Sequence, residues 1–221
     1  MTTVSSRLRT VIYNPLSYIH TQRLMLPAQL QKSAQLALIN RILIDHYQLS
    51  CVTPDVKPGS LDQLLLNNWS ELPYAAYLLA CHQQRNSLAR AGRLLRLPAW
   101  ARSFALLPLS ERLFPAENND VRSCEHAFLM QAGLQSLALL CEPASIALQQ
   151  RIPLLFASSP IAPAITATRA HFSLLLIALQ HVKKNSGHIY FPDPRRSIDQ
   201  RKSTHPDTTP SGDPVGSAQF S

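Results

Sequence analysis

The chain has 221 residues, of which 46% are hydrophobic, and its formal net charge is +8. This is enough apolar material for one sizeable core, in which roughly 70% of the surface of the extended chain is buried. Only 6 glycines occur, which argues against a turn-rich all-β protein. The basic balance predicts an acidic partner and leaves three classes open: nucleic acid, anionic lipid or an acidic protein face.

The first informative segment is Val11–Leu24, which places two tyrosines, a histidine and an arginine around an Asn-Pro step. Asn14 is a favourable N-cap and Pro15 fits a first helical turn, so a short helix is predicted to begin here. Leu16, Ile19 and Arg23 would then share one face of this helix, and the apolar face would dock on the core. Alternatively the segment binds another protein, since tyrosine and arginine are enriched at interfaces. The candidate partner-binding residues are Tyr13, Tyr18, His20 and Arg23.

An amphipathic helix is predicted over Pro27–Tyr47. Apolar residues recur there at four-residue spacing, which places them on one face of a helix. These residues are Leu30, Ala34, Leu38 and Ile42, joined by Ile39 and Leu43. A loop is predicted over Cys51–Gly59. Ser60 with Gln63 then matches a capping box, which predicts a short helix over Leu61–Trp69.

Pro73 fits the first turn of the next helix, whose pattern continues to Leu95. Gly92 inside this pattern costs about 1 kcal/mol relative to alanine, so the helix can break there. A shorter helix is predicted over Pro98–Leu107, where proline again marks the start.

The second half of the chain predicts three more helices, separated by irregular stretches over Pro108–Asn119 and around Pro153, Pro160 and Pro163. The predicted helices are Asp120–Cys141, Pro143–Arg151 and Ala164–Asn185. Residues 187–221 are rich in Pro, Ser, Thr and Asp and are predicted to be a disordered tail. The predicted fold class is therefore all-α, a single compact domain of roughly six to eight helices over residues 1–186 followed by that tail.

Catalytic and metal-binding chemistry has little support in the sequence. The cysteines, predicted to be reduced and mostly buried, are Cys51, Cys81, Cys124 and Cys141. A zinc site needs four convergent ligands, and Cys124 and His126 would point apart on a helix. Cys81 adjoins His82 without an orienting acid, so a Cys-His nucleophile stays open only in principle. We predict no enzymatic activity, metal or cofactor, and no apolar run is long enough to span a bilayer.

A run of arginines is the strongest charge feature, and between Asp62 and Glu111 the only acidic residue is Glu71. The arginines are Arg85, Arg90, Arg93, Arg96 and Arg102. On a continuous helix Arg90, Arg93 and Arg96 would share one side, because residues three apart are neighbours. They form either an ordinary solvated face or an electropositive patch that grips carboxylates bidentately, and both interpretations stay open.

Four segments together resemble the OrgA/MxiK/SctK family, the cytoplasmic sorting-platform adaptors of type III secretion systems. The more specific ones are Val11–Leu24 (VIYNPLSYIHTQRL) and Leu72–Phe104, which opens LPYAAYLLACHQQR and mixes aromatic, Pro, His, Cys and Arg residues in a fixed order. Weaker, leucine-rich matches are Arg151–Phe156 (RIPLLF) and Leu174–Lys183. The resemblance extends from about residue 10 to about residue 185.

This resemblance implies a non-enzymatic cytoplasmic adaptor, peripheral at the cytoplasmic face of the bacterial inner membrane. It implies two partners, the cytoplasmic domain of the inner-membrane ring protein (the SctD/PrgH/MxiG type) and the C-ring-like pod protein (the SctQ/SpaO type). The regulator of the platform's ATPase is a further implied neighbour. The alternative is a basic helical nucleic-acid-binding protein, which the net charge favours, although no helix-turn-helix signature can be placed securely.

Overall fold

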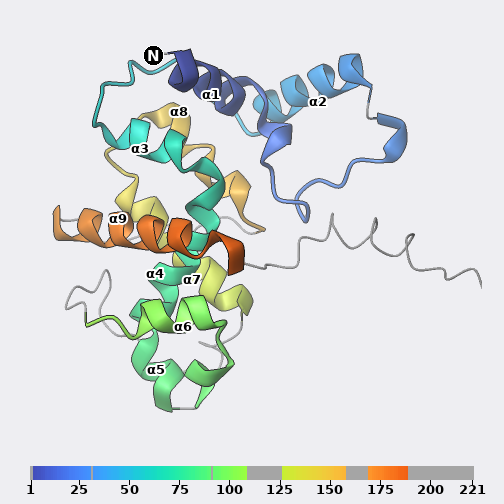
Figure 1. The fold of residues 1–221 in the computed structure, drawn as a ribbon. Helices are drawn as coiled ribbons and strands as arrows, with labels where there is room; N and C mark the ends of the chain where they lie inside the picture. The colour runs from blue at the N-terminus through green and yellow to red at the C-terminus, as the bar shows by residue number, and fades with distance from the viewer. Residues whose placement is uncertain (1, 31, 91, 109–125, 158–168, 189–221) are drawn as a thin grey trace, which may run out of the picture. The chain divides into compact units, whose positions relative to one another are not determined.

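The computed structural model describes residues 2–30, 32–90, 92–108, 126–157 and 169–188. Within these residues it contains nine α-helices and no strand, which confirms the all-α class (Figure 1). The helices are α1 (Thr2–Tyr13), α2 (Ser33–His46), α3 (Leu61–Asn67), α4 (Leu72–Gln83), α5 (Arg85–Arg90), α6 (Ala99–Ala105), α7 (His126–Leu140), α8 (Ile146–Gln149) and α9 (Arg169–Lys184).

Short 3-10 turns join several of these helices. They are η1 (Pro15–Ser17), η2 (Ala28–Leu30), η3 (Trp69–Glu71), η4 (Arg93–Arg96), η6 (Ile152–Leu155) and η7 (Ser186–His188). All described residues belong to one compact unit, residues 1–189. The predicted disorder of the tail, and most of the stretch predicted as irregular over Pro108–Asn119, lie outside the described residues.

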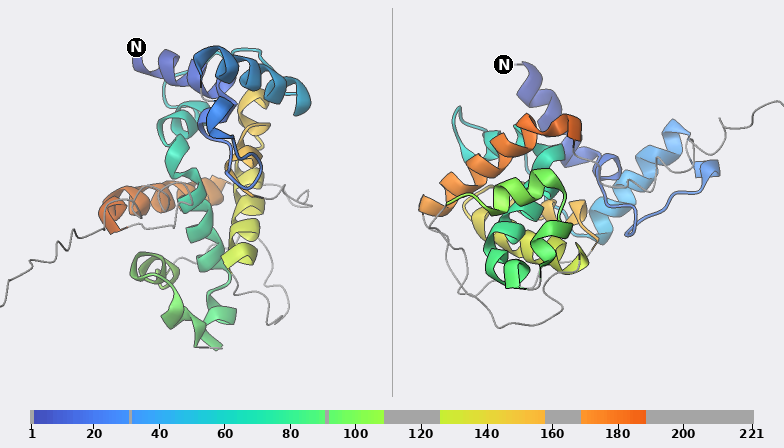
Figure 2. Two further views of the ribbon diagram at one scale, coloured as in Figure 1. Left: turned by 90° about the vertical axis from the view of Figure 1, so that its right-hand side faces the viewer. Right: turned by 60° about the horizontal axis from the view of Figure 1, so that its bottom comes forward.

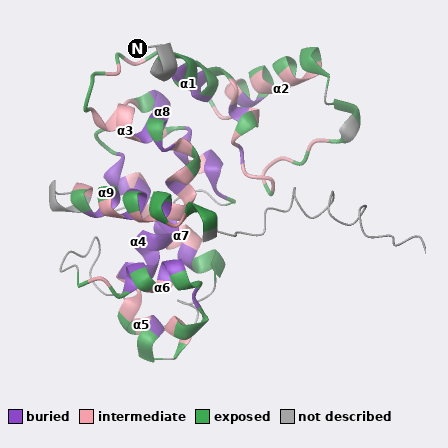
Figure 3. Ribbon diagram, in the orientation of Figure 1, coloured by how far each residue is buried: buried purple, intermediate pink, exposed green. Residues whose placement is uncertain are grey.

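Helix α4 lies at the centre of the core. It packs most extensively against α7 and also contacts α6 and α9, which crosses it (Figures 1 and 2). Its side chains are buried on all sides, as Figure 3 shows, because the sequence LPYAAYLLAC has no polar face to turn to solvent. The buried residues of α4 are Leu72, Ala75, Ala76, Tyr77, Leu78, Leu79, Ala80, Cys81 and His82.

A glycine sets how closely α7 approaches α4. A Cβ built on Gly133 of α7 would collide with the backbone carbonyl of Ala76 in α4, and it would lie 3.2 Å from the Ala76 Cβ. The absence of a side chain therefore allows the two helix backbones to come together. Small residues, Gly133 and Ala76, therefore lie at the point where α7 and α4 come closest.

Two local signals at the start of helices are confirmed. The Ser60 hydroxyl accepts the Gln63 N–H at 3.3 Å, as a capping box requires. The Gln63 side chain accepts the N–H of Gly59 at 2.6 Å, so the reciprocal bond goes to the residue before the cap. Pro73 lies in the first turn of α4, where its missing N–H needs no partner.

The short helix predicted to begin at Asn14 and Pro15 is present only as a 3-10 turn that starts at Pro15, without the predicted side-chain cap. Helix α1 precedes this step and ends at it: the Asn14 N–H donates to Thr10 O at 2.9 Å, and the Asn14 side chain caps nothing. Proline disfavours helical geometry in the residue before it, which terminates α1. Only the single 3-10 turn η1 follows, so Leu16, Ile19 and Arg23 do not share a helix face.

Only part of the apolar face predicted for α2 is buried. Ile39 and Leu43 face inward and pack in a cluster with Ile19 and Leu154. The other predicted apolar residues are exposed, and these are Leu30 in η2 and Ala34, Leu38 and Ile42 in α2. The apolar arc of this helix is wider than one packing face can cover, so periodicity alone did not indicate which part of the arc is buried.

Other helix boundaries differ from the predicted ones near proline and glycine residues. The helix predicted to reach Leu95 stops at Gln83, and after α5 the chain turns at Gly92, which adopts a left-handed φ of 63°. Pro153, predicted in a loop, lies inside η6. Residues 120–125 and 164–168, predicted to begin the helices that the structure describes as α7 and α9, lie outside the described residues.

Candidate functional site

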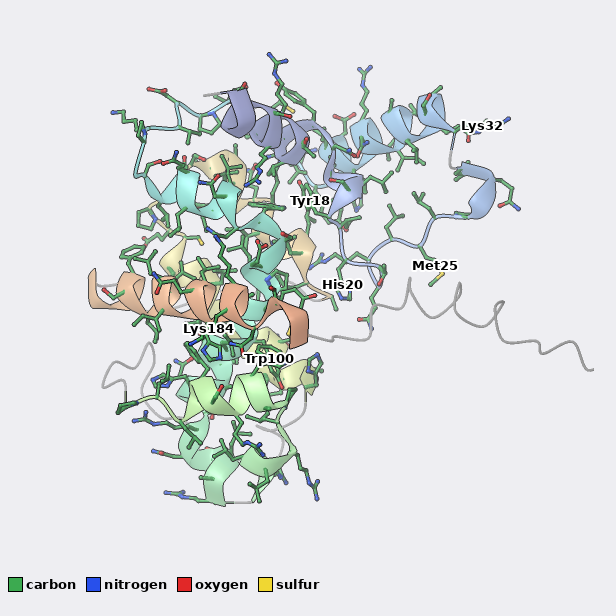
Figure 4. The ribbon with its side chains drawn as sticks, in the orientation of Figure 1. Tyr18, His20, Met25, Lys32, Trp100 and Lys184 are labelled. Atoms are coloured by element: carbon green, nitrogen blue, oxygen red, sulfur yellow. The ribbon has the colours of Figure 1, made fainter. Side chains whose placement is uncertain are left out.

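The segment after α1 is hydrogen-bonded to the RIPLLF sequence, which contains the turn η6. The His20 N–H donates to the Leu154 carbonyl at 2.7 Å, and Arg23 Nε donates to the carbonyl of Phe156. Two segments about 130 residues apart in sequence are thus joined by one bond between main-chain groups and one bond from a side chain to a main-chain carbonyl. Figure 4 labels His20 in this segment. The segment from residue 11 to 24 therefore contributes directly to the packing of the domain.

Tyr18 is the aromatic centre of this region. Its hydroxyl donates to the Val11 carbonyl at 2.9 Å, and its ring meets Trp69 edge-to-face at a centroid distance of 5.4 Å. Burial raises the pKa of Tyr18 far above its usual value and outweighs the opposing effect of the nearby Arg151 guanidinium. The phenol is therefore a neutral donor at every physiological pH.

Tyr13 differs from the other three candidates of this segment. Its side chain is 50% exposed, and its hydroxyl donates to the carbonyl of Cys51 at the long distance of 3.4 Å. Tyr18 and Arg23 hold neighbouring elements together, and His20 does so through its main chain. Of these four residues, Tyr13 presents the largest aromatic surface to a partner.

Arg151 is the residue that the sequence interpretation missed. Its side chain is fully buried, and its guanidinium donates four hydrogen bonds to main-chain carbonyls. The acceptors are Val11 at 3.2 Å, Ile12 at 2.8 Å, Ser50 at 2.8 Å and Ala147 at 2.7 Å. Val11 and Ile12 belong to the last turn of α1, where unpaired carbonyls attract a cation. One side chain therefore connects α1, the loop after α2, and α8.

The arginine series is divided between three elements. Arg93 and Arg96 belong to η4, and because a 3-10 helix has three residues per turn they point to the same side. Arg90 ends α5 on the other side of Gly92, so the predicted single face of three arginines on one helix was wrong. Arg102 donates to the Leu95 carbonyl at 3.4 Å, and Arg85 to the Leu107 carbonyl at 3.2 Å.

Leu95 lies between the two arginines of η4 and is 74% exposed. We call Arg93, Leu95 and Arg96 the arginine surface. Arg96 is exposed and Arg93 is half-buried, so exposed apolar area and guanidinium groups occur within one turn of η4. This mixture of arginine and exposed apolar area is typical of protein interfaces.

Two of the three described thiols are buried and poorly reactive. Cys81 is fully buried, and burial raises its pKa to about 12; burial likewise raises the pKa of Cys141.

We therefore expect iodoacetamide at mildly alkaline pH to modify the exposed Cys51 in the native chain, and Cys81 and Cys141 only after unfolding. Peptide mapping by mass spectrometry tests this, and equal native labelling of Cys51 and Cys81 would contradict it. Cys124 lies outside the described residues.

No three His, Cys, Asp or Glu side chains converge as metal ligands in the part of the chain that the structure describes. His126 packs against the Tyr77 ring at 5.1 Å, and burial lowers its pKa. A different histidine, His181, joins α9 to α6, because its Nε2 lies 2.7 Å from the Trp100 carbonyl oxygen. None of the described helices is both long and apolar enough to cross a bilayer.

Comparison with known proteins places these features in a family. A family model described as a bacterial type III secretion apparatus protein (OrgA_MxiK) matches residues 8–184. The oxygen-regulated invasion protein OrgA of Salmonella typhimurium is 37% identical over 175 residues, covering 79% of this chain and 85% of that protein. Protein MxiK of Shigella flexneri is 24% identical over 178 residues, covering 80% of this chain and 88% of that protein. No solved structure matches the chain.

The matched region contains the two segments that are hydrogen-bonded to each other, residues 11–24 and Arg151–Phe156. It extends to the end of α9. The resemblance noted from the sequence is therefore confirmed over most of the chain. The chain belongs to the OrgA/MxiK family of bacterial type III secretion apparatus proteins.

Proposed function

We propose that this protein is a non-enzymatic adaptor that links the inner-membrane ring of a type III secretion system to its cytosolic sorting platform. It would lie at the cytoplasmic face of the inner membrane and be held there by the ring. Its partners would be the cytoplasmic domain of the ring protein and the C-ring-like pod protein, with the ATPase regulator nearby. Membership in a family of type III secretion apparatus proteins supports this role.

The observation that carries the proposal is the arginine surface. From Leu72 to Ser110 the sequence contains no Asp or Glu, while five arginines lie in this stretch. A surface of this sign attracts an acidic face, and arginine can bind a carboxylate with two parallel hydrogen bonds. Leu95 supplies exposed apolar area in the same turn, and water-excluding apolar contacts strengthen neighbouring charged bonds.

Tethering of this kind needs affinity and geometry without chemical turnover. The helices around α4 hold the arginine surface in place, because η4 packs against α5 and α5 follows α4. Tyr13 lies at the end of α1, in a different part of the chain, and is an anchor candidate for a second partner. A body that holds two such surfaces raises the effective concentration of one partner near the other.

Reversing the charge of the arginine surface should weaken binding to the ring. We expect Arg93→Glu with Arg96→Glu to lower affinity for the isolated cytoplasmic domain of the ring protein by about 100-fold, measured by calorimetry at physiological salt. The matched control is Lys183→Glu with Lys184→Glu, which makes the same charge change at exposed positions at the end of α9 (Figure 4 labels Lys184). Equal loss in both variants, or no loss in the first, would contradict the assignment. Circular dichroism should be unchanged in both.

The net charge of +8 also favours the alternative of nucleic-acid binding. A titration with mixed-sequence duplex DNA distinguishes the two, because several phosphate contacts make affinity fall steeply with salt concentration. The adaptor proposal predicts DNA binding far weaker than ring binding at physiological salt. Tight DNA binding with a steep salt slope would favour the alternative.

A further inference from the structure

The outward side of α2 carries an apolar stripe without a described neighbour on it. Leu38 is 59% exposed and Ile42 is 54% exposed, although the opposite side of the same helix packs inward through Leu43. Figure 3 shows exposed positions along α2. The exposed residues recur at the spacing of one helix face and are Ala34, Ala37, Leu38, Arg41, Ile42 and Asp45. Contiguous apolar surface of this kind marks an interaction site.

The stripe is complementary to itself. Ala34 and Ile42 lie four residues before and after Leu38 on the same face. If a second copy of α2 runs antiparallel, with a two-fold axis passing beside Leu38, each Leu38 meets the other Leu38 and each Ala34 meets an Ile42. A small side chain then lies opposite a large one on both sides of the axis, which is the arrangement that lets facing helices interdigitate.

The charges at the two ends fit the same register. Lys32 precedes the first turn of α2, and Asp45 lies in its last turn; both are exposed, and both oppose the dipole of their own helix. In the antiparallel pair Asp45 lies beside Lys32 and the N-terminal end of α2 in the other copy. This arrangement relieves both unfavourable interactions between a charge and its own helix dipole. A parallel pair would bring like charges together. Figure 4 labels Lys32 at this end of the helix.

We propose that α2 is a self-association helix, which pairs antiparallel with α2 of a second copy of this chain about Leu38. Its 14 residues extend only about 21 Å, so this contact alone buries less than the roughly 1,200 Å² of a stable interface. The dimer is therefore weak in free solution and dependent on concentration. This inference goes beyond the adaptor role and does not depend on the arginine surface.

Disulfide trapping tests the register. In a full-length background with Cys51→Ser and Cys124→Ser, Leu38→Cys should form a cross-linked dimer under mild oxidation. Ile42→Cys alone should give a yield about ten-fold lower, because its symmetry mate lies about 12 Å further along the helix pair, beyond disulfide reach. Mixing Ala34→Cys with Ile42→Cys should restore the cross-link. Equal yields for Leu38→Cys and Ile42→Cys, or none for either, would overturn the proposal.

Sedimentation over about 1 to 300 µM, the range of weak interfaces, tests the association itself. The weight-average mass of the natural chain should rise toward that of a dimer. Leu38→Glu should keep the helical circular dichroism spectrum and stay monomeric, whereas Leu106→Glu, at another exposed leucine, should associate like the natural chain. A natural chain that stays monomeric throughout, or equal effects of the two substitutions, would refute self-pairing and leave the stripe to a foreign protein or lipid.

Discussion

Replacing Arg151 by methionine should lower the free energy of unfolding by about 3 to 5 kcal/mol. The substitution keeps most of the side-chain volume but removes every donor, so carbonyls of Ile12, Ser50 and Ala147 lose a buried hydrogen bond. Each unsatisfied buried carbonyl costs about 1 to 3 kcal/mol, and partial relaxation keeps the total below the simple sum. Urea unfolding followed by circular dichroism measures the change.

Two further variants identify the cause. Arg151→Lys keeps the charge but has one nitrogen that cannot span acceptors on α1 and α8, so most of the loss should remain. Arg102→Met removes an arginine whose described bond, to Leu95 O at 3.4 Å, is long and exposed, so it should cost less than about 1 kcal/mol. If Arg151→Lys were as stable as the natural chain, the charge and not the hydrogen-bond geometry would be the stabilising feature.

Replacing Gly133 by alanine should destabilise the protein by about 2 kcal/mol, although the same change in an ordinary helix stabilises it by about 1 kcal/mol. The added methyl group would collide with the Ala76 carbonyl, and since both groups are main chain, neither can move without shifting α7 against α4. Overpacking of a core costs about 1 to 3 kcal/mol and occasionally more, which outweighs the gain in helix propensity.

Thermal unfolding of Gly133→Ala beside Gly187→Ala makes the comparison. A Cβ at Gly187 meets nothing within 4 Å, so that variant should change stability little. A stabilised Gly133→Ala protein would mean that α4 and α7 do not approach each other as described.

The sequence predicted the all-α class and several helix starts because these depend on local chemistry. Ser60 caps α3 with its own hydroxyl, and Pro73 fits the first turn of α4 wherever the rest of the chain lies. The break at Gly92 was also considered, since glycine readily adopts a positive φ. Signals that act within one turn of helix were therefore sufficient for these elements.

What the sequence did not reveal depends on contacts between distant segments. The helix predicted after Asn14 gives way to a segment whose main chain bonds to Leu154 and whose Arg23 bonds to Phe156. Arg151 resembles any surface arginine in sequence, because its acceptors are main-chain carbonyls that carry no residue-type signature. Only α1 had a usable signal that was overlooked: Val4, Leu8, Val11 and Ile12 recur at helical spacing.

The candidate partner-binding residues were predicted by type, and the structure separates them by position. Tyr18 and Arg23 bond to other parts of the domain, whereas Tyr13 and Arg96 are exposed. Residue type cannot distinguish an arginine that holds the core together from one that faces solvent, because the same donors serve both. Partner binding by the exposed residues stays a prediction.

The bridging role is tested most directly by light scattering on a three-component mixture. The ring protein's cytoplasmic domain, the pod protein and this chain are combined at equal concentrations, and the mass of the eluted complex is measured. The adaptor account predicts a complex that contains all three proteins and forms only when this chain is present, with Arg93→Glu and Arg96→Glu releasing the ring domain alone. A mixture in which the two partners exclude each other, or in which neither binds this chain, would contradict it.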